Sequence, residues 1–364
     1  MKFFTLLLGL LILTNGLYSQ SEKSERTFPD NIFRIVDKDS SKLEWFPIFN
    51  YDSELGFGYG VKTFWLNPLG YNESFDLLLF ASTKGERWAR FVFSIPDFEL
   101  RQGKKYDISA DLVIDYDLIK KIRFFGIGNN SLYENDVEYT KIPANVKLVL
   151  GRGFSREIVA QVKFNYNRIV NHGLDVQSIY PGYTKVAENL ITGILLRYDK
   201  RDSYINPKSG YYLSFEYDYS PKILENGVEF DKRILDIANY VTIWNVVIAA
   251  RLKYENINGD VLPLQIFPTL GGTWSLRGYP QERFIGDETV LFNSELRFPL
   301  PWNFGAVAGF DAGKIIEENE NTIDNWKYNW TAGLRYYFKT FILRFDLGFS
   351  NEYTGVFFNI GHVF

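Results

Sequence analysis

Histidine is the side chain that most often serves as a general acid or base, and the chain contains two, His172 and His362. His172 lies in the segment Asn171-His172-Gly173, with Asp175 close behind it, and His362 lies near the end of the chain. A hydrolase would need one of them beside a nucleophile at an accessible position. A histidine in such a loop is usually just exposed, so we expect no enzyme and no catalytic residue. A surface enzyme that uses His172 is the alternative.

Metal and cofactor chemistry finds little support in the composition. The chain has no Cys, and its two histidines form no cluster with metal-ligand spacing, so we expect no metal site and no cofactor. The segment Glu317-Glu318-Asn319-Glu320-Asn321 could bind cations, and lipopolysaccharide through them, although a solvated loop explains it equally well. The net charge of -4 gives no support for nucleic-acid binding, which requires a basic patch.

One segment carries an arginine in an unusual setting. It reads Gly271-Gly272-Thr273-Trp274-Ser275-Leu276-Arg277-Gly278-Tyr279. Glycine permits backbone angles that other residues avoid, and Gly278 lets the chain turn sharply beside Arg277. A guanidinium fork is suited to carboxylates, so Arg277 is a candidate for ion pairing. The alternative is that Arg277 is a solvated loop charge.

Strands, not helices, must position these residues. Apolar and polar side chains alternate along much of the chain, most clearly in 108–116, 159–167, 211–219 and 341–349. Several strands run about 9–11 residues, which is the length that a tilted strand needs to cross a bilayer. Aromatic residues, 18% of the chain, gather near the strand ends as membrane-interface girdles do. We therefore predict an all-β fold, a transmembrane antiparallel barrel that closes on itself.

The predicted barrel has about 16 strands, an even number as bacterial single-chain barrels have. The strands start near Glu54, run to Phe364, and include 230–238 and 264–270. We assign residues 1–20 to a signal peptide, 21–50 to a short periplasmic tail and 51–364 to the barrel. The N-terminus is typical of secretory signals, because Lys2 is followed by an apolar run and then by a polar stretch. The apolar run is too short to span a membrane.

The last predicted strand resembles the C-terminal targeting signal of outer-membrane barrels. Alternation places Val356, Phe358, Ile360, His362 and Phe364 on one face, which we assign to lipid or the membrane interface. We propose Phe358, Ile360 and Phe364 as the signal. An ordinary closing strand is the alternative.

Several motifs together resemble the BamA/TamA outer-membrane family, also called the bacterial surface antigen family. The segment from Leu276 to Tyr279 is similar to its [V/L]-R-G-[F/Y] loop. The other motifs follow the family order: Phe124-Phe125-Gly126-Ile127-Gly128-Asn129, then Arg197-Tyr198-Asp199-Lys200-Arg201-Asp202 with Asn206-Pro207 and Gly210, then Asn293-Ser294-Glu295-Leu296-Arg297-Phe298-Pro299, then Phe310-Asp311-Ala312-Gly313. The resemblance extends from about Pro47 to Phe364.

The resemblance implies that the arginine loop folds back into the barrel lumen and meets acidic residues on the inner wall. Alternation in the strands after the loop allows Glu295 and Asp311 to face that lumen. These two acids are therefore the expected partners of Arg277. Such a pair would serve conformational specificity more than stability, because burying charge is costly.

The resemblance also implies a function. The family includes barrel insertases and two-partner secretion transporters, so we expect an integral outer-membrane protein that assists insertion, assembly or translocation of proteins. Its expected partners are outer-membrane lipid, lipopolysaccharide, assembly subunits and client outer-membrane proteins. We recognise none of the periplasmic substrate-handling (POTRA) modules of insertases in this sequence. A passive pore or a structural accessory barrel of a larger complex is therefore the alternative.

Overall fold

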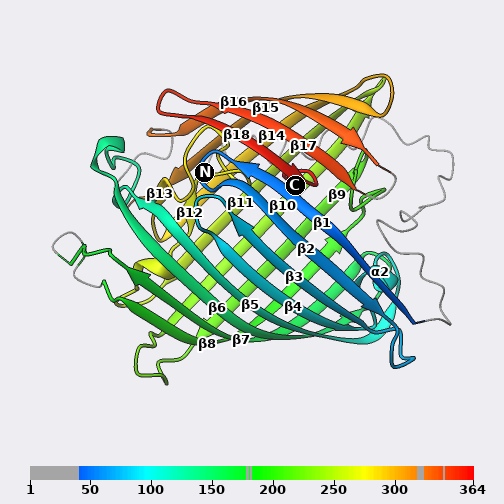
Figure 1. Ribbon diagram of the computed structural model, residues 1–364, viewed down its shortest axis with the longest axis horizontal. Coiled ribbons are helices and arrows are strands. Elements are labelled where there is room, and N and C mark those ends of the chain that lie inside the picture. The colour runs from blue at the N-terminus through cyan, green and yellow to red at the C-terminus, as the bar shows by residue number, and fades with distance from the viewer. Residues whose placement is uncertain (1–40, 178–179, 181–182, 318–323, 339–340) are drawn as a thin grey trace.

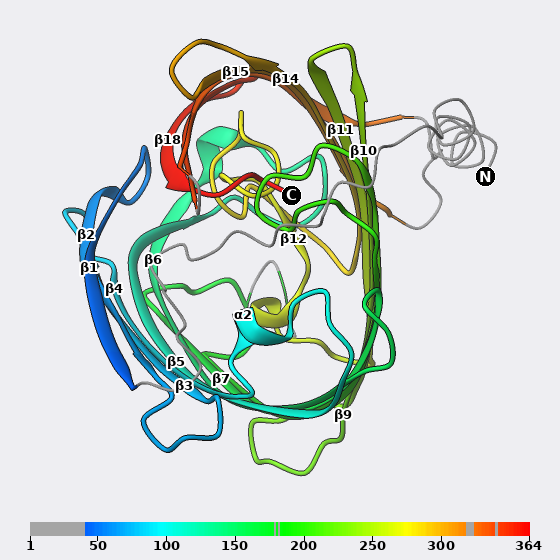
Figure 2. The same ribbon diagram turned by 90° about the vertical axis from the view of Figure 1, so that its right-hand side faces the viewer.

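The protein is a closed barrel of 16 antiparallel strands. The computed structural model describes residues 41–364, apart from 178–179, 181–182, 318–323 and 339–340. Tilted strands form the wall in Figure 1, and Figure 2 looks into the barrel, where parts of the chain lie inside the ring. In the described part of the chain, no helix is long and apolar enough to cross a membrane.

The wall follows chain order, with each strand hydrogen-bonded to its sequence neighbours. Its strands are β1 (Lys42–Asp52), β2 (Gly56–Leu66), β3 (Ser74–Ser82), β4 (Arg87–Ile95), β5 (Tyr106–Phe124), β6 (Val137–Gly153), β7 (Ile158–His172), β8 (Val186–Asp199), β9 (Gly210–Ser220), β10 (Phe230–Ile243), β11 (Val246–Asn258), β14 (Glu288–Pro299), β15 (Phe304–Ile315), β16 (Lys327–Tyr337), β17 (Ile342–Phe349) and β18 (Thr354–Ile360).

Short elements lie in the connections. A separate ribbon of β12 (Thr269–Leu270) and β13 (Phe284–Ile285) leaves β11 to pair directly with β14. The other short elements are α2 (Phe98–Arg101), η2 (Tyr133–Asn135) and η3 (Leu264–Ile266). Asp97 caps α2 through the backbone N–H groups of Glu99 and Leu100.

The alternation in the sequence becomes the two faces of the wall. In β5, Ile108 is 70% exposed on the outer face, whereas the adjacent Ser109 is 1% exposed inside. In β9, Leu213 and Phe215 point outward, and Ser214 and Asp218 are buried in the lumen. The apolar outer face therefore suits lipid, and the polar residues gather inside.

The predicted strand number is correct, but the predicted start of the barrel and one predicted strand are wrong. The first strand begins at Lys42, inside the stretch 21–50 that we expected to be a tail. Pro47 lies in the middle of this strand and obscured it, because proline cannot donate a ladder hydrogen bond and is unusual within strands. Conversely, 264–270 is not a wall strand but contains η3 and β12. The predicted strand at 230–238 is confirmed within β10. The predicted signal peptide, 1–20, lies outside the described residues.

The seam where the barrel closes is its least regular junction. Strands β1 and β2 pair over eleven residues of each strand, from Lys42↔Leu66 to Asp52↔Gly56. Across the seam, the register of β1 and β18 contains only Tyr51↔Phe358 and Asp52↔Phe357. Among the described residues, the stretch of β1 before Tyr51 has no strand partner on its seam side.

Candidate functional site

The connection between β11 and β14, residues 259–287, lies within the barrel and is called the inner loop below. Figure 2 shows this yellow segment inside the ring of strands. The β12–β13 ribbon holds the two ends of its central turn together. Gly271 and Gly272 follow β12 with φ of +122° and +83°, angles that favour glycine, so the chain reverses there.

Apolar packing fixes the central turn of the inner loop. Leu276 and Tyr279 are buried together with Leu270, Phe284 and Leu291. The Tyr279 hydroxyl also donates a hydrogen bond to the carbonyl oxygen of Tyr328 on β16. Two of the four residues in the Leu276–Tyr279 motif, the first and the last, thus hold the turn in place on either side of Arg277.

Arg277 lies at the centre of a buried ionic site. Its Nε and Nη2 donate to the two oxygens of Asp311, both over 2.9 Å, which is a bidentate arrangement. Its Nη1 donates to Oε1 of Glu295 over 2.7 Å and to Oδ2 of Asp346 over 3.3 Å. All four side chains have zero exposure. The structure thus brings Arg277 together with both expected acids and adds a third, Asp346.

Further arginines extend this site along the inner wall. Arg335 pairs with Glu295 and with Asp346, and Arg297 pairs with Glu295 over 2.8 Å. Arg344 lies 3.7 Å from Asp346. We call this set the lumen ion cluster; its members are Arg277, Arg297, Arg335, Arg344, Glu295, Asp311 and Asp346.

The lumen ion cluster contains four cations and three anions, so it carries one surplus positive charge. Burial alone would lower the pKa of Arg277, but the Asp311 and Glu295 carboxylates outweigh it and hold that pKa well above its usual value. Sequence reasoning did not propose the other arginines or Asp346 as site residues. The available signal was their inward position in the alternating strands.

Two glycines on the wall, which have no side chains, allow the inner loop to lie directly against the strands. A Cβ atom on Gly348 of β17 would lie 2.2 Å from the carbonyl oxygen of Arg277, and one on Gly355 of β18 would lie 2.4 Å from it. These two glycines are register partners, so they form a bare patch across β17 and β18. The backbone of the motif therefore rests directly on the strand that closes the barrel.

The inner loop also has contacts on both sides of the seam. On the C-terminal side, the Thr273 hydroxyl accepts hydrogen bonds from Arg344 (2.9 Å) and from Asn359 of β18 (3.0 Å). On the N-terminal side, the backbone N–H of Gln281 donates to Glu54, in the turn after β1, over 2.6 Å. The inner loop is therefore a brace behind the seam.

Comparison with known proteins agrees with this architecture. The family profile of the Omp85 superfamily domain matches residues 67–364. The chain belongs to the Omp85 superfamily. No curated protein sequence matches this Omp85 chain at a significant level.

Among solved structures, the Omp85 barrel is similar to BamA from Haemophilus ducreyi lacking POTRA domains 1–3, with a TM-score of 0.65 at 14% identity over 89% of this chain and 70% of that one. It is also similar to CdiB from Escherichia coli, with a TM-score of 0.60 at 13% identity. That match covers 87% of this chain but 62% of CdiB. The likeness shows a shared barrel fold, and an Omp85 barrel of this size is an integral outer-membrane protein.

A second motif of the Omp85 chain anchors a loop to the wall. Asn129, at the end of the segment that starts at Phe124, is 1% exposed. Its side-chain amide donates to the carbonyl oxygen of Ile315 and accepts from the N–H of the same residue, so it acts as a strand partner for the end of β15. The motif thus has a structural task in this chain.

The C-terminal residues do not lie where alternation predicted. Phe358 and Ile360 continue the outer face of β18, and Ile360 is 42% exposed. At Gly361 the backbone turns, with φ of +90°, and the following residues leave the wall. His362 is buried and bonds Asn206 (3.1 Å), while the Phe364 ring lies 6.2 Å from that of Tyr240. The assignment of His362 and Phe364 to the lipid face is therefore wrong, because a left-handed glycine interrupts the alternation.

The remaining candidates of the sequence analysis are the two histidines and the acidic segment. His172 is exposed at the end of β7, and burial and the nearby Arg297 lower the pKa of His362 far below its usual value. In the described ranges, no group of three or more acids and histidines is arranged to hold a metal ion. Of the acidic segment, residues 318–321 lie outside the described residues, and Glu317 accepts a hydrogen bond from Asn129.

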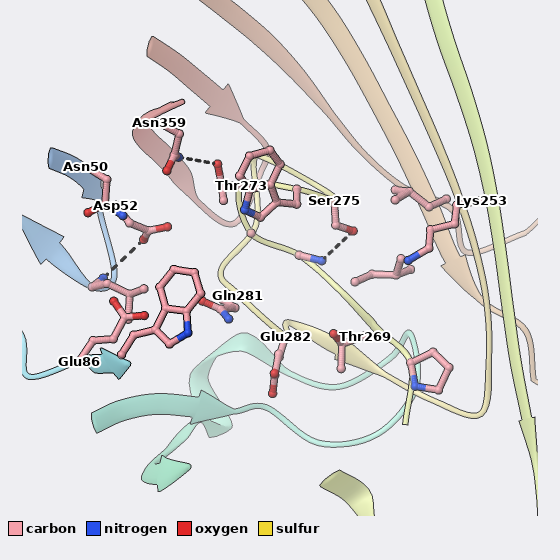
Figure 3. Close-up of a pocket in the computed structure, with 18 of the residues that line it drawn as sticks. Asn50, Asp52, Glu86, Lys253, Thr269, Thr273, Ser275, Gln281, Glu282 and Asn359 are labelled. Carbon is pink, nitrogen blue, oxygen red and sulfur yellow. Dashed lines mark hydrogen bonds between the residues drawn. The ribbon is translucent and has the colours of Figure 1, made fainter. Parts of the chain in front are cut away.

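A cavity of about 740 Å³ separates the inner loop from part of the wall. Figure 3 shows Asp52 and Glu86 on one side of the loop and Lys253 on the other. Ile48 and Asn50 of β1 and Asn359 of β18 also line the cavity, so it reaches the unpaired part of the seam. Phe49 and Ile360, which face outward on these strands, line it as well.

Proposed function

We propose that this Omp85 barrel assists the insertion, assembly or translocation of proteins at the outer membrane by opening its β1–β18 seam. The observation that carries the proposal is the unpaired edge of β1. The two strands share two register pairs, and β1 continues for nine residues before them. An unpaired edge offers backbone N–H and C=O groups to another strand. In a client protein, an unfolded strand has the same groups to satisfy within the bilayer.

The inner loop would control this edge. Its contacts reach β17 and β18 through Arg277 and Thr273, and the turn after β1 through Gln281. An opening of the seam must therefore break or carry along one set of these contacts. We propose that Leu276, Arg277, Gly278 and Tyr279 hold the closed state, with Glu295 and Asp311 as the wall partners of Arg277.

The expected partners follow from the two faces of the wall. The exposed apolar outer residues would contact outer-membrane lipid and lipopolysaccharide. The free edge would contact client outer-membrane proteins, and assembly subunits would supply client-handling modules. We propose export by the signal peptide at residues 1–20, and Phe358, Ile360 and Phe364 as the targeting signal. No catalytic activity, metal or cofactor is part of the proposal.

A disulfide across the seam tests the proposal, because the chain has no native Cys. Tyr51→Cys with Phe358→Cys places two thiols at register partners of β1 and β18. The control is Tyr59→Cys with Ala81→Cys, register partners in β2 and β3. The purified barrel is placed in phosphatidylcholine liposomes, and the refolding rate of an unfolded eight-stranded outer-membrane barrel is measured.

We expect the wild-type barrel to speed refolding of the client. The oxidised seam pair should abolish this gain and a reductant should restore it, whereas the oxidised control should act as wild type. Equal client refolding with the seam locked or free would overturn the proposal.

A passive pore or accessory barrel is the second candidate, and the 740 Å³ cavity beside the inner loop favours it. A pore requires a continuous aqueous path, which the loop would narrow. Steady single-channel conductance in planar bilayers that is unchanged in Arg277→Ala would support the pore. A silent bilayer would count against it.

A further inference from the structure

Three carboxylates lie in a row on the inner wall beside the seam. Asp52 ends β1, Glu86 lies in the turn between β3 and β4, and Asp117 faces inward from β5. Between the first two, β2 presents Gly56 opposite Asp52 and Gly58 opposite Ser82, so it contributes no side chain at these positions. Asp52 and Asp117 are both close enough to Glu86 to raise its pKa by repulsion.

Two oxygens of this row have no visible partner. Glu86 Oε2 and Asp117 Oδ1 are shielded from solvent, and neither has a hydrogen-bond partner among the described residues. A shielded carboxylate oxygen without a donor is costly. A proton on one carboxyl supplies an O–H donor and removes one of the repelling charges, as in other pairs of adjacent carboxyls.

Neither of the two lysines beside the row donates a hydrogen bond to these two oxygens. Lys84, in the same turn as Glu86, uses its Nζ to donate to the carbonyl oxygen of Ser53 over 2.7 Å, and it also attracts Asp52. The side chain of Lys120 packs over Gly85.

The other charged groups around the row are paired with one another. Asp115, next to Asp117 on the inner face of β5, is bonded by Trp88 and by Arg90.

Across the cavity, Glu282 of the inner loop pairs with Lys141, and Glu255 of β11 pairs with Lys232 and Lys253. In the turn after β1, Glu54 pairs with Arg123.

We propose that Glu86 carries a proton when the β1–β18 seam is closed, and that loss of this proton loosens the seam. Asp52 is the connecting residue. It is one of the two β1 residues in register with β18, and its Oδ1 accepts from the N–H of Glu54, which fixes the turn after β1. A second negative charge at Glu86 and Asp117 repels Asp52 and so strains both features.

The position of Glu86 suits it to respond near neutral pH. Burial, followed by the repulsion from Asp117 and Asp52, raises its pKa from 4.5 to about 7. Glu86 and Asp52 line the 740 Å³ cavity, which gives water a route to the row. This proposal takes one point from the proposed function, namely that the β1–β18 seam is the part of the barrel that moves.

The test measures the seam without any client. Nitroxide labels on Tyr51→Cys and Phe358→Cys report their separation through dipolar broadening in continuous-wave spectra, recorded from pH 5 to pH 9 in phosphatidylcholine liposomes. Labels on Tyr59→Cys and Ala81→Cys serve as the reference. We expect broadening at the seam at low pH, lost with a midpoint near pH 7, and no change at the reference pair.

Variants separate the acid row from other groups. Glu86→Gln and Asp117→Asn should each keep the seam closed across the range, while Glu225→Gln, an exposed acid in the loop after β9, should titrate as the wild type. Spectra of the wild type that do not change with pH would overturn the proposal, as would a transition retained in Glu86→Gln. Neither result depends on whether the locked seam stops client refolding, so the two proposals fail separately.

Discussion

Arg277 and Asp346 are 69 residues apart in sequence, and their side chains meet over 3.3 Å inside the barrel with no solvent exposure. This contact joins the inner loop to β17, next to the strand that closes the barrel. Because Arg277 also holds Glu295 and Asp311, one guanidinium connects β14, β15 and β17. The inner loop is thus tied to three strands of the wall through charge.

Removal of the central cation should therefore be costly. In Arg277→Ala, three buried carboxylates lose their shared donor, and breaking a buried pair by removing one partner typically costs about 3–5 kcal/mol. We expect a loss of that size in the free energy of unfolding, measured by urea titration in liposomes. The control is Arg152→Ala, because Arg152 forms an exposed pair with Asp107 at 3.8 Å and should contribute about 0–1 kcal/mol. Equal stability of the two variants would show that the buried contacts contribute little.

A methyl group on the bare patch of the wall should displace the loop. In Gly355→Ala, the added Cβ would lie 2.4 Å from the carbonyl oxygen of Arg277, far inside normal contact. Such overpacking usually costs about 1–3 kcal/mol, and the inner loop should become more sensitive to proteolysis. Ala332→Val adds bulk on the exposed face of β16 and is the control. If the inner loop of Gly355→Ala is no more sensitive to proteolysis than that of the wild type, the wall can shift enough to accommodate the added methyl group.

The barrel was predictable from sequence because its period-two alternation is repeated along the whole chain. Glu295 and Asp311 could be placed on the inner wall for the same reason. The strand at Lys42 was missed because Pro47 breaks the pattern, and the inward turn after Ile360 was missed because it depends on one left-handed glycine. Asp346 joins the cluster through a contact between distant segments, and no local pattern encodes which inward acid the loop will reach.

Thr273 should connect the loop to the last strand. In Thr273→Val the shape is kept, but Arg344 and Asn359 lose their shared acceptor. A hydrogen bond to a charged group contributes about 1.5–3 kcal/mol, so we expect a loss near the lower end of that range. A double-mutant cycle with Asn359→Ala measures the coupling. Additive effects would indicate that the Thr273–Asn359 contact does not contribute.

Stability should fall as pH rises through the range set by Glu86. The pKa of its carboxyl is about 7 in the folded protein, because of burial and the repulsion from Asp117 and Asp52, against 4.5 when unfolded. The folded state therefore binds the proton more tightly. Its contribution to stability is complete below about pH 4.5 and is lost as the pH rises to about 7.

Glu86→Gln should remove this dependence. Relative to the wild type, it should be more stable at pH 8 by about 1–2 kcal/mol, an amount reduced for the partial solvent screening of Glu86. At pH 4 the two proteins should be close in stability, because Gln resembles the protonated acid. Urea titrations at several pH values measure the difference, with Glu225→Gln as the control. A difference that is the same at pH 4 and pH 8 would mean that Glu86 titrates normally, and the strain at the seam would then need another source.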